Sequence, residues 1–204
     1  PLLLSSAASD VYKRQILGTS GIVIPYSTAS FAAAIRQQIA VVSSMNDDYV
    51  VLTTGGRSED FAREIIELPD HSFIQMGDFS GYTIKQCARK ELKKAYVAGF
   101  IGKLAKMAAG VKQTHVKGGK VDMKFLSELA KRCDANSETI GKILGANTAR
   151  NVQEIIMEDK INGFFDEITK ETWNQMRQHS EEKIPVEVIL FDFDGKVLSK
   201  YGKE

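Results

Sequence analysis

Short apolar runs rich in β-branched residues alternate with helical patterns over the first half of the chain. The apolar runs lie at 16–23, 49–54, 72–77 and 93–100, and amphipathic patterns predict helices at 27–40, 58–67 and 80–92. Strands that alternate with helices are typical of βαβ units, in which the strands run parallel. We therefore predict an α/β fold, a Rossmann-like open parallel sheet with helices on both faces.

The pattern becomes mainly helical after Gly110 and ends in two strands. Helices are predicted at 123–132, 137–144, 148–159 and 169–182. The final stretch VEVILFDFDGKVLSKY predicts a strand over 186–193, a turn at Asp194 and Gly195, and a short return strand, because Asp-Gly is a strong hairpin signal. The predicted fold thus includes a helical segment and a C-terminal β-hairpin.

The first fifteen residues, PLLLSSAASDVYKRQ, do not fit this pattern. They have no basic segment ahead of the three leucines, which argues against a secretory signal peptide. SSAASDVYKRQ is typical of translated sequencing-adaptor read-through. We expect residues 1–15 to be a non-native leader and residues 16–204 to form one Rossmann-like domain. Its first strand, over 16–22, is then expected to be short and central in the sheet.

Charge and composition narrow the class of partner. Lys and Arg number 27 against 26 Asp and Glu, a net charge of +1, so the chain has no broad basic face for nucleic acid. No apolar run approaches the about 18 residues of a membrane-spanning helix. Cys87 and Cys133 have no CxxC or Cys/His spacing, and we expect them to be free buried thiols. These features predict a soluble, cytoplasmic protein without nucleic-acid or membrane partners.

Glycine-bearing loops follow all four predicted parallel strands of the first half. They read GTSG, TTGGRSED, MGDFSG and GFIGK. Ligands of open α/β sheets bind at the carboxyl ends of the strands, and glycine lets backbone N–H groups approach a ligand closely. The loops therefore predict a binding site at this edge. The alternative is that the glycines only make tight turns between strands and helices.

The loop TTGGRSED places two carboxylates at a predicted helix start. Glu59 and Asp60 could accept hydrogen bonds from ribose hydroxyls, or they could complement the helix dipole. An acidic residue about twenty positions after the first glycine turn would favour NAD, but residues 38–41 there are not acidic. NAD binding is therefore disfavoured.

The loop GFIGK places Lys103 in the first turn of a helix. It lacks the spacing of a phosphate-binding P-loop, and Leu104 stands where that motif has a hydroxyl for magnesium, so ATP hydrolysis is disfavoured. A lysine is unfavourable at a helix N-terminus. Either a negative ligand or a carboxylate should compensate Lys103, unless it is simply solvated.

The stretch ILFDFDGKV, over 189–197, resembles the first motif of haloacid-dehalogenase phosphatases, in which a strand-end aspartate attacks phosphorus. Such a site needs a lysine and metal-binding carboxylates from a domain that follows the motif. We therefore favour the hairpin turn over a phosphatase site for Asp192.

Taken in order, the loops resemble the CbiD family, the cobalt-precorrin-5B C-1 methyltransferases of anaerobic cobalamin biosynthesis. The stretches that carry the resemblance are GTSGIVIP, TTGGRSEDFA, DFSG, GFIGKLAKMAAG followed by QTH, and ANTARNVQEII. The chain departs from the family pattern at Gly56, Ser58, Phe100 and Gln113, where the family has Asn, Gly, His and Asn. The resemblance implies that residues 16–204 are the C-terminal domain of a methyltransferase whose N-terminal α+β domain is missing.

This resemblance implies methylation of C-1 of cobalt-precorrin-5B with S-adenosyl-L-methionine as methyl donor. It assigns donor binding to Gly18, Thr19, Ser20, Gly21, Thr54, Gly55, Gly56, Glu59 and Asp60. It assigns Lys103 and His115 to the acidic side chains of the tetrapyrrole, or His115 to its metal; no resident metal is expected, and no catalytic residue is identified. The chain alone is expected to be inactive, and a homo-oligomer stays open. The alternative is a non-enzymatic nucleotide-binding or interaction module on the same fold.

Overall fold

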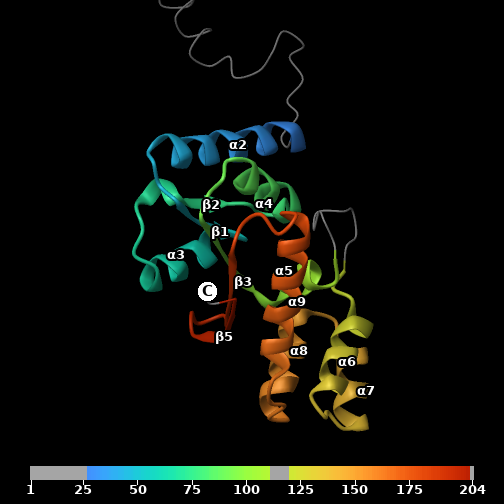
Figure 1. Cartoon of the computed structure of the whole chain (residues 1–204). Coiled ribbons are helices and arrows are strands. Elements are labelled where there is room, and N and C mark those ends of the chain that lie inside the picture. Colours follow the sequence, from blue (N-terminus) through green and yellow to red (C-terminus); the bar gives the residue numbers. More distant parts are fainter. Residues whose placement is uncertain (1–26, 111–119, 203–204) are drawn as a thin grey trace, which may run out of the picture. The chain divides into compact units, whose positions relative to one another are not determined.

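One five-stranded sheet organises the chain (Figure 1). The computed structural model describes residues 27–110 and 120–202, and contacts group residues 32–204 into one compact unit. The strands, in the order β2-β1-β3-β4-β5, are β1 (Tyr49–Thr53), β2 (Phe73–Gln75), β3 (Lys94–Phe100), β4 (Val186–Phe191) and β5 (Val197–Tyr201). The first four run parallel and β5 is antiparallel to β4. The predicted α/β fold with an open, mostly parallel sheet is confirmed.

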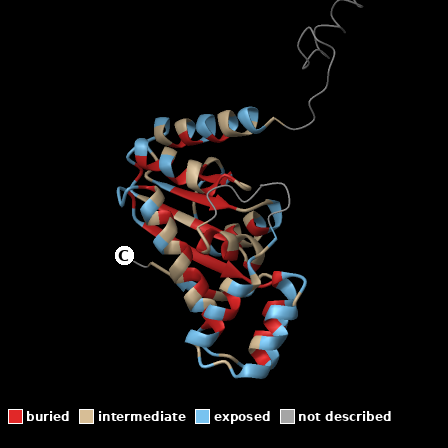
Figure 2. Ribbon diagram, turned by 90° about the vertical axis from the view of Figure 1, so that its right-hand side faces the viewer, coloured by how far each residue is buried: buried red, intermediate tan, exposed pale blue. Residues whose placement is uncertain are grey.

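The helices connect and cover these strands. They are α2 (Thr28–Ser44), α3 (Gly56–Ile65), α4 (Ser80–Arg89), α5 (Ile101–Ala108), α6 (Met123–Arg132), α7 (Ser137–Gly145), α8 (Ala149–Glu158) and α9 (Phe164–His179), with a 3-10 turn η1 (Asp70–Ser72). Helix α3 packs on β1, β2 and β3, whereas α5 and α9 pack on the opposite side (Figure 1). The strands between them are almost entirely buried (Figure 2).

The alternation of side chains along the strands explains these layers. Val51, Ala98 and Ile189 point to one face and pack with Ala62 of α3 in one apolar cluster. Their neighbours along the strands point to the other face, since successive side chains of a strand alternate. Both sets are buried, so the strands read as continuous apolar runs, as expected for a parallel sheet with helices on both faces.

Side-chain caps fix the starts of α6, α7 and α8, three of the helices between β3 and β4. Asp122, Asn136 and Thr148 accept a hydrogen bond from the backbone N–H three residues later, at 3.0, 2.9 and 3.1 Å. Such caps satisfy N–H groups that have no partner within the helix, and each contributes about 1 kcal/mol. The predicted starts of α6 and α7 are therefore confirmed, and that of α8 lies within one residue.

Several predicted boundaries are wrong. Helix α2 ends at Ser44 and not at residue 40, and α4 ends at Arg89 and not at residue 92. Helix α9 begins at Phe164 and not at residue 169, because Gly163 turns the chain in a left-handed conformation and Phe164 is fully buried. Strand β4 ends at Phe191 and not at residue 193. The hairpin connection is longer than a two-residue turn, and Gly195, with φ of +91°, has a positive φ whereas Asp194 does not.

The strand predicted at 16–23 lies outside the described residues. Strands β1 and β3 pair directly with each other over five residue pairs, and each has a second neighbour on its other side. The central place expected for that strand is therefore filled by described strands. The leader predicted at 1–15 also lies outside the described residues.

Both cysteines are free thiols, as predicted, but they differ in burial. Burial raises the pKa of the Cys87 thiol to about 12. Cys133 is half-buried, whereas the sequence predicted that it is buried, and its pKa is also raised, mainly by burial and then by the Glu167 carboxylate.

Because the thiolate is the reactive form, we expect iodoacetamide at about pH 8 to leave Cys87 intact and to modify Cys133 slowly. Mass spectrometry with and without urea measures this, and equal Cys87 labelling in both would contradict it.

Within residues 27–110 and 120–202, no helix has the length and apolar content needed to cross a bilayer.

Candidate functional site

The order of connections creates a topological switch point between the carboxyl ends of β1 and β3, which we call the crevice. Helix α3 leads from β1 to β2 on one side, and α4 then leads past β1 to β3 on the other side. The helices that follow β1 and β3 therefore leave to opposite faces of the sheet. In open α/β sheets, ligands bind at this topological switch point. The loops that end there are the predicted loops TTGGRSED and GFIGK.

Gly99 allows these two loops to lie close together, because it has no side chain. A Cβ at this position would lie 2.7 Å from Cγ2 and 2.8 Å from Oγ1 of Thr54. The Thr54 hydroxyl lies 3.3 Å from Oγ of Ser58, and the Ser58 hydroxyl donates to the carbonyl of Gly55 at 2.8 Å. The glycine of the GFIGK loop thus lets the Thr54 side chain pack against β3, while Ser58 stabilises the turn into α3.

Gly55 has a different role from Gly99, because the described residues leave the space beside it open. It precedes α3 as the N-cap residue without a side-chain cap, in extended backbone geometry. Among residues 27–110 and 120–202, no atom lies within 4 Å of the position that a Cβ would take, and Gly56 is exposed. Local packing therefore does not require glycine at position 55. A ligand in the crevice could approach this backbone closely.

Two hydroxyls at this edge are buried without a hydrogen-bond partner among the described residues. They are Oγ1 of Thr53, the last residue of β1, and Oγ of Ser80, the first residue of α4; both residues are fully buried. An unpaired buried polar group costs about 1–3 kcal/mol. Such groups at a strand-end crevice are consistent with a site that a polar ligand completes.

The predicted carboxylates of the TTGGRSED loop differ in their surroundings. Oε1 of Glu59 accepts hydrogen bonds from Nη2 and Nε of Arg63, at 2.8 and 3.1 Å. This hydrogen bond and the Glu59 charge raise the pKa of the Arg63 guanidinium. Asp60 is exposed. Glu59 thus stabilises α3 through an i,i+4 ion pair, and its contact with a ligand, like that of Asp60, stays a prediction.

Lys103 forms an ion pair with Asp78, which lies in the loop after β2. The Asp78 side chain is largely buried and that of Lys103 is about one third exposed. The structure thus supplies a carboxylate that compensates the lysine at the start of α5, one of the two forms of compensation predicted from the sequence. Because β1 lies between β2 and β3, this pair joins the loops on either side of β1.

Asp192 is committed to the turn of the β4–β5 hairpin. Its Oδ1 accepts hydrogen bonds from the backbone N–H groups of Asp194 and Lys196, at 2.9 and 2.8 Å, and the residue is 8% exposed. A carboxylate that accepts two backbone amides in this way fixes a turn. The geometry supports the hairpin interpretation over the phosphatase interpretation.

Several predicted site residues cannot be placed. Gly18, Thr19, Ser20, Gly21 and His115 lie outside the described residues, and their roles stay predictions. Among the described residues, no group of three or more His, Cys, Asp or Glu side chains is placed to hold a metal ion. The described part of the predicted site is therefore built from the loops after β1, β2 and β3.

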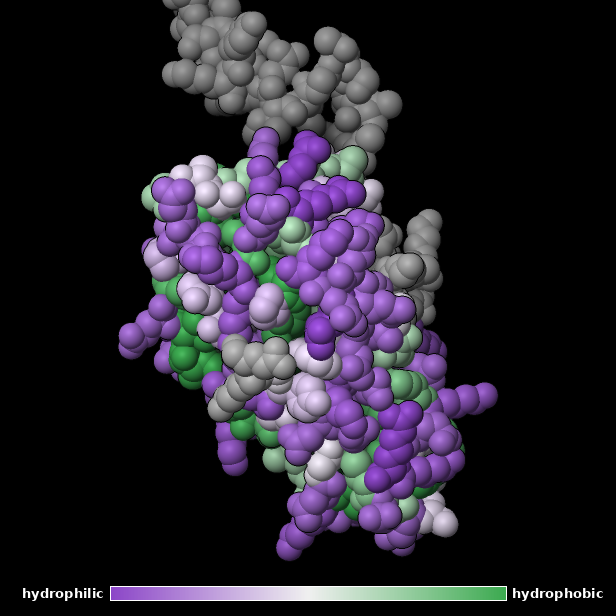
Figure 3. Space-filling view, viewed as in Figure 1, coloured by the Kyte–Doolittle hydropathy of each residue, from purple (hydrophilic) through white to green (hydrophobic). Residues whose placement is uncertain are grey.

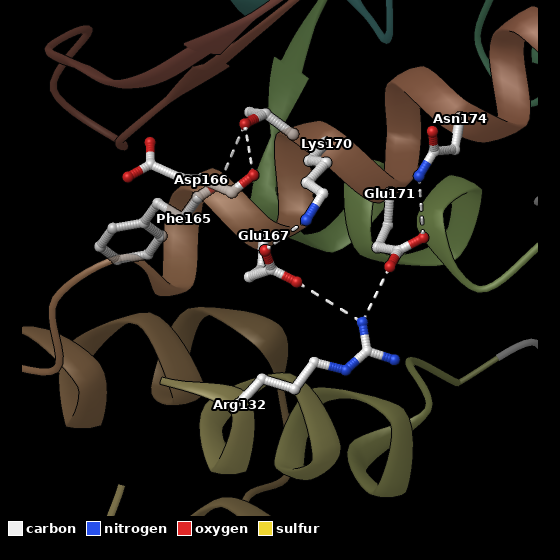
Figure 4. Close-up of polar contacts among 8 residues, drawn as sticks. Arg132, Phe165, Asp166, Glu167, Lys170, Glu171 and Asn174 are labelled. Carbon is white, nitrogen blue, oxygen red and sulfur yellow. Dashed lines mark hydrogen bonds and ion pairs between the residues drawn. The ribbon is translucent and has the colours of Figure 1, made fainter. Parts of the chain in front are cut away.

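A cavity of about 870 Å³ lies elsewhere, where the C-terminal ends of α6 and α8 meet the start of α9. Three of its charged groups are paired: Arg132 contacts Glu167 at 3.5 Å and Glu171 of α9 at 2.8 Å, and Lys170 contacts Glu167 at 3.0 Å (Figure 4). This network joins α6 to α9. We therefore assign the cavity no ligand.

Comparison with known proteins identifies the family. Residues 113–202 match the family model described as CbiD, C-terminal domain. Residues 113–202 carry the C-terminal domain of the CbiD family. The predicted family is thus confirmed. In the structure, this CbiD match takes in α6 to α9 and the β4–β5 hairpin, while the described glycine loops precede it.

Curated relatives extend the similarity over most of the chain. It is 39% identical to the cobalt-precorrin-5B C(1)-methyltransferase of Priestia megaterium over 91% of its length, and that match covers 51% of the relative. It is 41% identical to the protein of the same name from Leptospira interrogans, with the same coverage of both chains. The chain spans about half the length of the curated relatives it matches. No solved structure matches it.

Proposed function

We propose that this chain forms the methyl-donor site of a cobalt-precorrin-5B C(1)-methyltransferase, which methylates C-1 of its substrate with S-adenosyl-L-methionine in anaerobic cobalamin biosynthesis. The observation that carries the proposal is the open space beside Gly55 at the topological switch point between β1 and β3. The names of the relatives supply the reaction, since the enzymes similar to this chain are methyltransferases.

The residues of the crevice suit an adenosyl donor. Residues 54–56 present backbone at the start of α3, where N–H groups without helical partners favour carboxylate or hydroxyl oxygens. The unpaired hydroxyls of Thr53 and Ser80 add polar groups at the same edge. Asp60 is exposed on α3, one residue after Glu59 of the first turn, and a carboxylate there could accept hydrogen bonds from ribose hydroxyls.

Methyl transfer places modest demands on the protein. The bound donor supplies an electrophilic methyl group on a sulfonium centre. The protein has to hold the donor and the nucleophilic ring carbon in line, because alignment of two reactants lowers the barrier without any acid or base acting on the methyl group. In our proposal the Thr54–Ser58 hydrogen bonds keep the donor loop rigid, and the Lys103–Asp78 pair fixes the neighbouring loops.

Calorimetry with S-adenosylmethionine and S-adenosylhomocysteine tests the donor site. We expect both to bind this chain, and ATP to bind much more weakly. Absence of binding by both compounds would refute the donor site. Equal binding of ATP would favour the alternative, a nucleotide-binding module without methyl transfer. That this chain is catalytically impaired on its own stays a prediction, because the activity named for the relatives belongs to proteins of about twice its length.

A further inference from the structure

Two arginines and two phenylalanines gather beside the crevice, at the carboxyl ends of β3 and β4. We call Arg57, Phe100, Arg150 and Phe193 the guanidinium–phenyl rim. The rings of Phe100 and Phe193 stack nearly parallel, 5.4 Å apart between centroids and 8° from coplanar. Both residues are half-buried, and both arginines are exposed. The sequence analysis assigned none of these four residues to donor or substrate binding.

The Arg57 guanidinium rests against two phenylalanine rings and has no acidic partner within the described residues. Its guanidinium carbon lies 5.8 Å from the centre of the Phe61 ring and 6.0 Å from that of Phe100, and Nη2 donates to the carbonyl of Phe193. Within the described residues, no carboxylate forms an ion pair with Arg57. An exposed arginine that rests on aromatic rings is pre-organised and keeps N–H groups for a further acceptor.

Arg150 approaches the same ring pair from the helical segment. Its guanidinium carbon lies 4.8 Å from the centre of the Phe193 ring, and its Nε contacts Glu154 at 3.2 Å on the exposed side of α8. Helix α8 reaches this edge because its first residue, Ala149, packs against Gly102, where a Cβ would lie 3.8 Å from that of Ala149. The stretch ANTARN thus brings a second cation to the rim.

The hairpin turn gives Phe193 its position. Asp192 fixes the turn through two backbone amides, and Gly195 packs directly on the ring of Phe61. Hydrophobic side chains reach the surface beside α3, whereas the surface over α9 is mainly hydrophilic (Figure 3). The stretch FDFDG therefore acts as a scaffold for an aromatic surface. Asp192 is a positioning residue in this arrangement.

The rim combines the groups that recognise a flat ring with carboxylate side chains. Stacked aromatic rings offer an apolar face to a conjugated ring, and guanidinium groups bind carboxylates with charge-assisted, often bidentate hydrogen bonds. We propose that the rim binds the carboxylate side chains of the tetrapyrrole substrate, with Arg57 and Arg150 as substrate-binding residues. This inference rests on the proposed function for the identity of the ring.

A carboxylate could also come from the methyl donor, which carries one on its amino-acid part. Most of the rim favours the ring substrate, because Phe100, Arg150 and Phe193 do not belong to the loop proposed for the donor. Arg57 alone lies in that loop, two residues after Gly55. The two sources make different predictions for the same variants, so a binding experiment separates them.

The experiment measures binding of three probes to this chain by titration calorimetry. The probes are cobyrinic acid, a corrinoid with free carboxylates; its fully esterified methyl ester; and S-adenosylhomocysteine. The variants are Arg57→Gln, Arg150→Gln, the double variant and Phe193→Leu. Arg89→Gln is the matched control, since it removes the same charge from an exposed position at the last residue of α4. Circular dichroism verifies that each variant is folded.

We expect Arg57→Gln and Arg150→Gln each to weaken cobyrinic acid binding about tenfold, the loss of one charge-assisted interaction, and the double variant to weaken it further. The ester and S-adenosylhomocysteine should bind as before, while Phe193→Leu should weaken both corrinoids. The inference is overturned if the wild-type chain does not bind cobyrinic acid, if the arginine variants behave like Arg89→Gln, or if they lose S-adenosylhomocysteine instead. Failure of S-adenosylhomocysteine alone to bind the wild type would refute the donor site and leave the rim intact.

Discussion

Replacing Gly195 by alanine is expected to lower the free energy of unfolding by about 2–4 kcal/mol. Gly195 has φ of +91°, a backbone conformation that costs an L-residue about 1–2 kcal/mol. The new Cβ would also lie 2.6 Å from a carbon of the Phe61 ring. Forcing an extra carbon into a packed site costs typically about 1–3 kcal/mol. Both terms act together because the ring cannot move freely: it contacts Phe100 and Phe191.

Urea denaturation followed by circular dichroism measures this loss. Gly141→Ala is the matched control, because Gly141 lies in α7 with no atom within 4 Å of the Cβ position, and alanine should stabilise the helix by about 0.5–1 kcal/mol. A Gly195→Ala variant as stable as the wild type would contradict the proposed packing of the hairpin on α3. Because Phe61 also contacts Phe100, the variant should weaken corrinoid binding at the rim as well.

The strands and most helices could be predicted from the sequence because local signals specify them. The apolar runs of β1 to β4 are buried on both faces, and α6 to α8 start at side-chain caps visible in the sequence. The start of α9 could not be predicted in this way. Gly163 caps it without a side chain, and the burial of Phe164 depends on tertiary packing.

The site was predictable where glycines mark a loop and not where distant segments meet. The loops after β1 and β3 could be recognised in the sequence by their glycines, and the strand order places them at the switch point. Four separate segments of the chain contribute the rim residues Arg57, Phe100, Arg150 and Phe193, so no spacing along the chain links them. Arg57 lies inside the predicted loop TTGGRSED, but Asp60 stands three residues later, so the sequence did not show that Arg57 lacks an ion pair. Glu59, by contrast, has Arg63 four residues later and pairs with it.

Replacing Gly55 by threonine is expected to weaken donor binding about ten- to hundredfold without destabilising the fold. Position 55 is the N-cap of α3 and lacks a side-chain cap, so a threonine hydroxyl can accept a hydrogen bond from the first turn and add about a few tenths of a kcal/mol of stability. The backbone there is extended, and no atom of the part of the chain that the structure describes lies within 4 Å of the Cβ position. The added carbon atoms therefore enter the space proposed for the donor. A clash of about 1–3 kcal/mol with a rigid ligand gives the expected loss of affinity.

Calorimetry with S-adenosylhomocysteine measures the affinity, and urea denaturation measures the stability of the same variant. Gly141→Thr is the control, since it adds the same side chain in equally open space on α7 and should leave donor binding unchanged. Unchanged binding by Gly55→Thr, with the wild-type chain binding the donor, would place the donor away from this loop. A destabilised Gly55→Thr would instead show that position 55 is packed. Loss of binding with retained stability would show that the glycine at position 55 is needed for a ligand. Gly99 differs, because a substitution there must displace the Thr54 side chain and should therefore lower the stability of the fold.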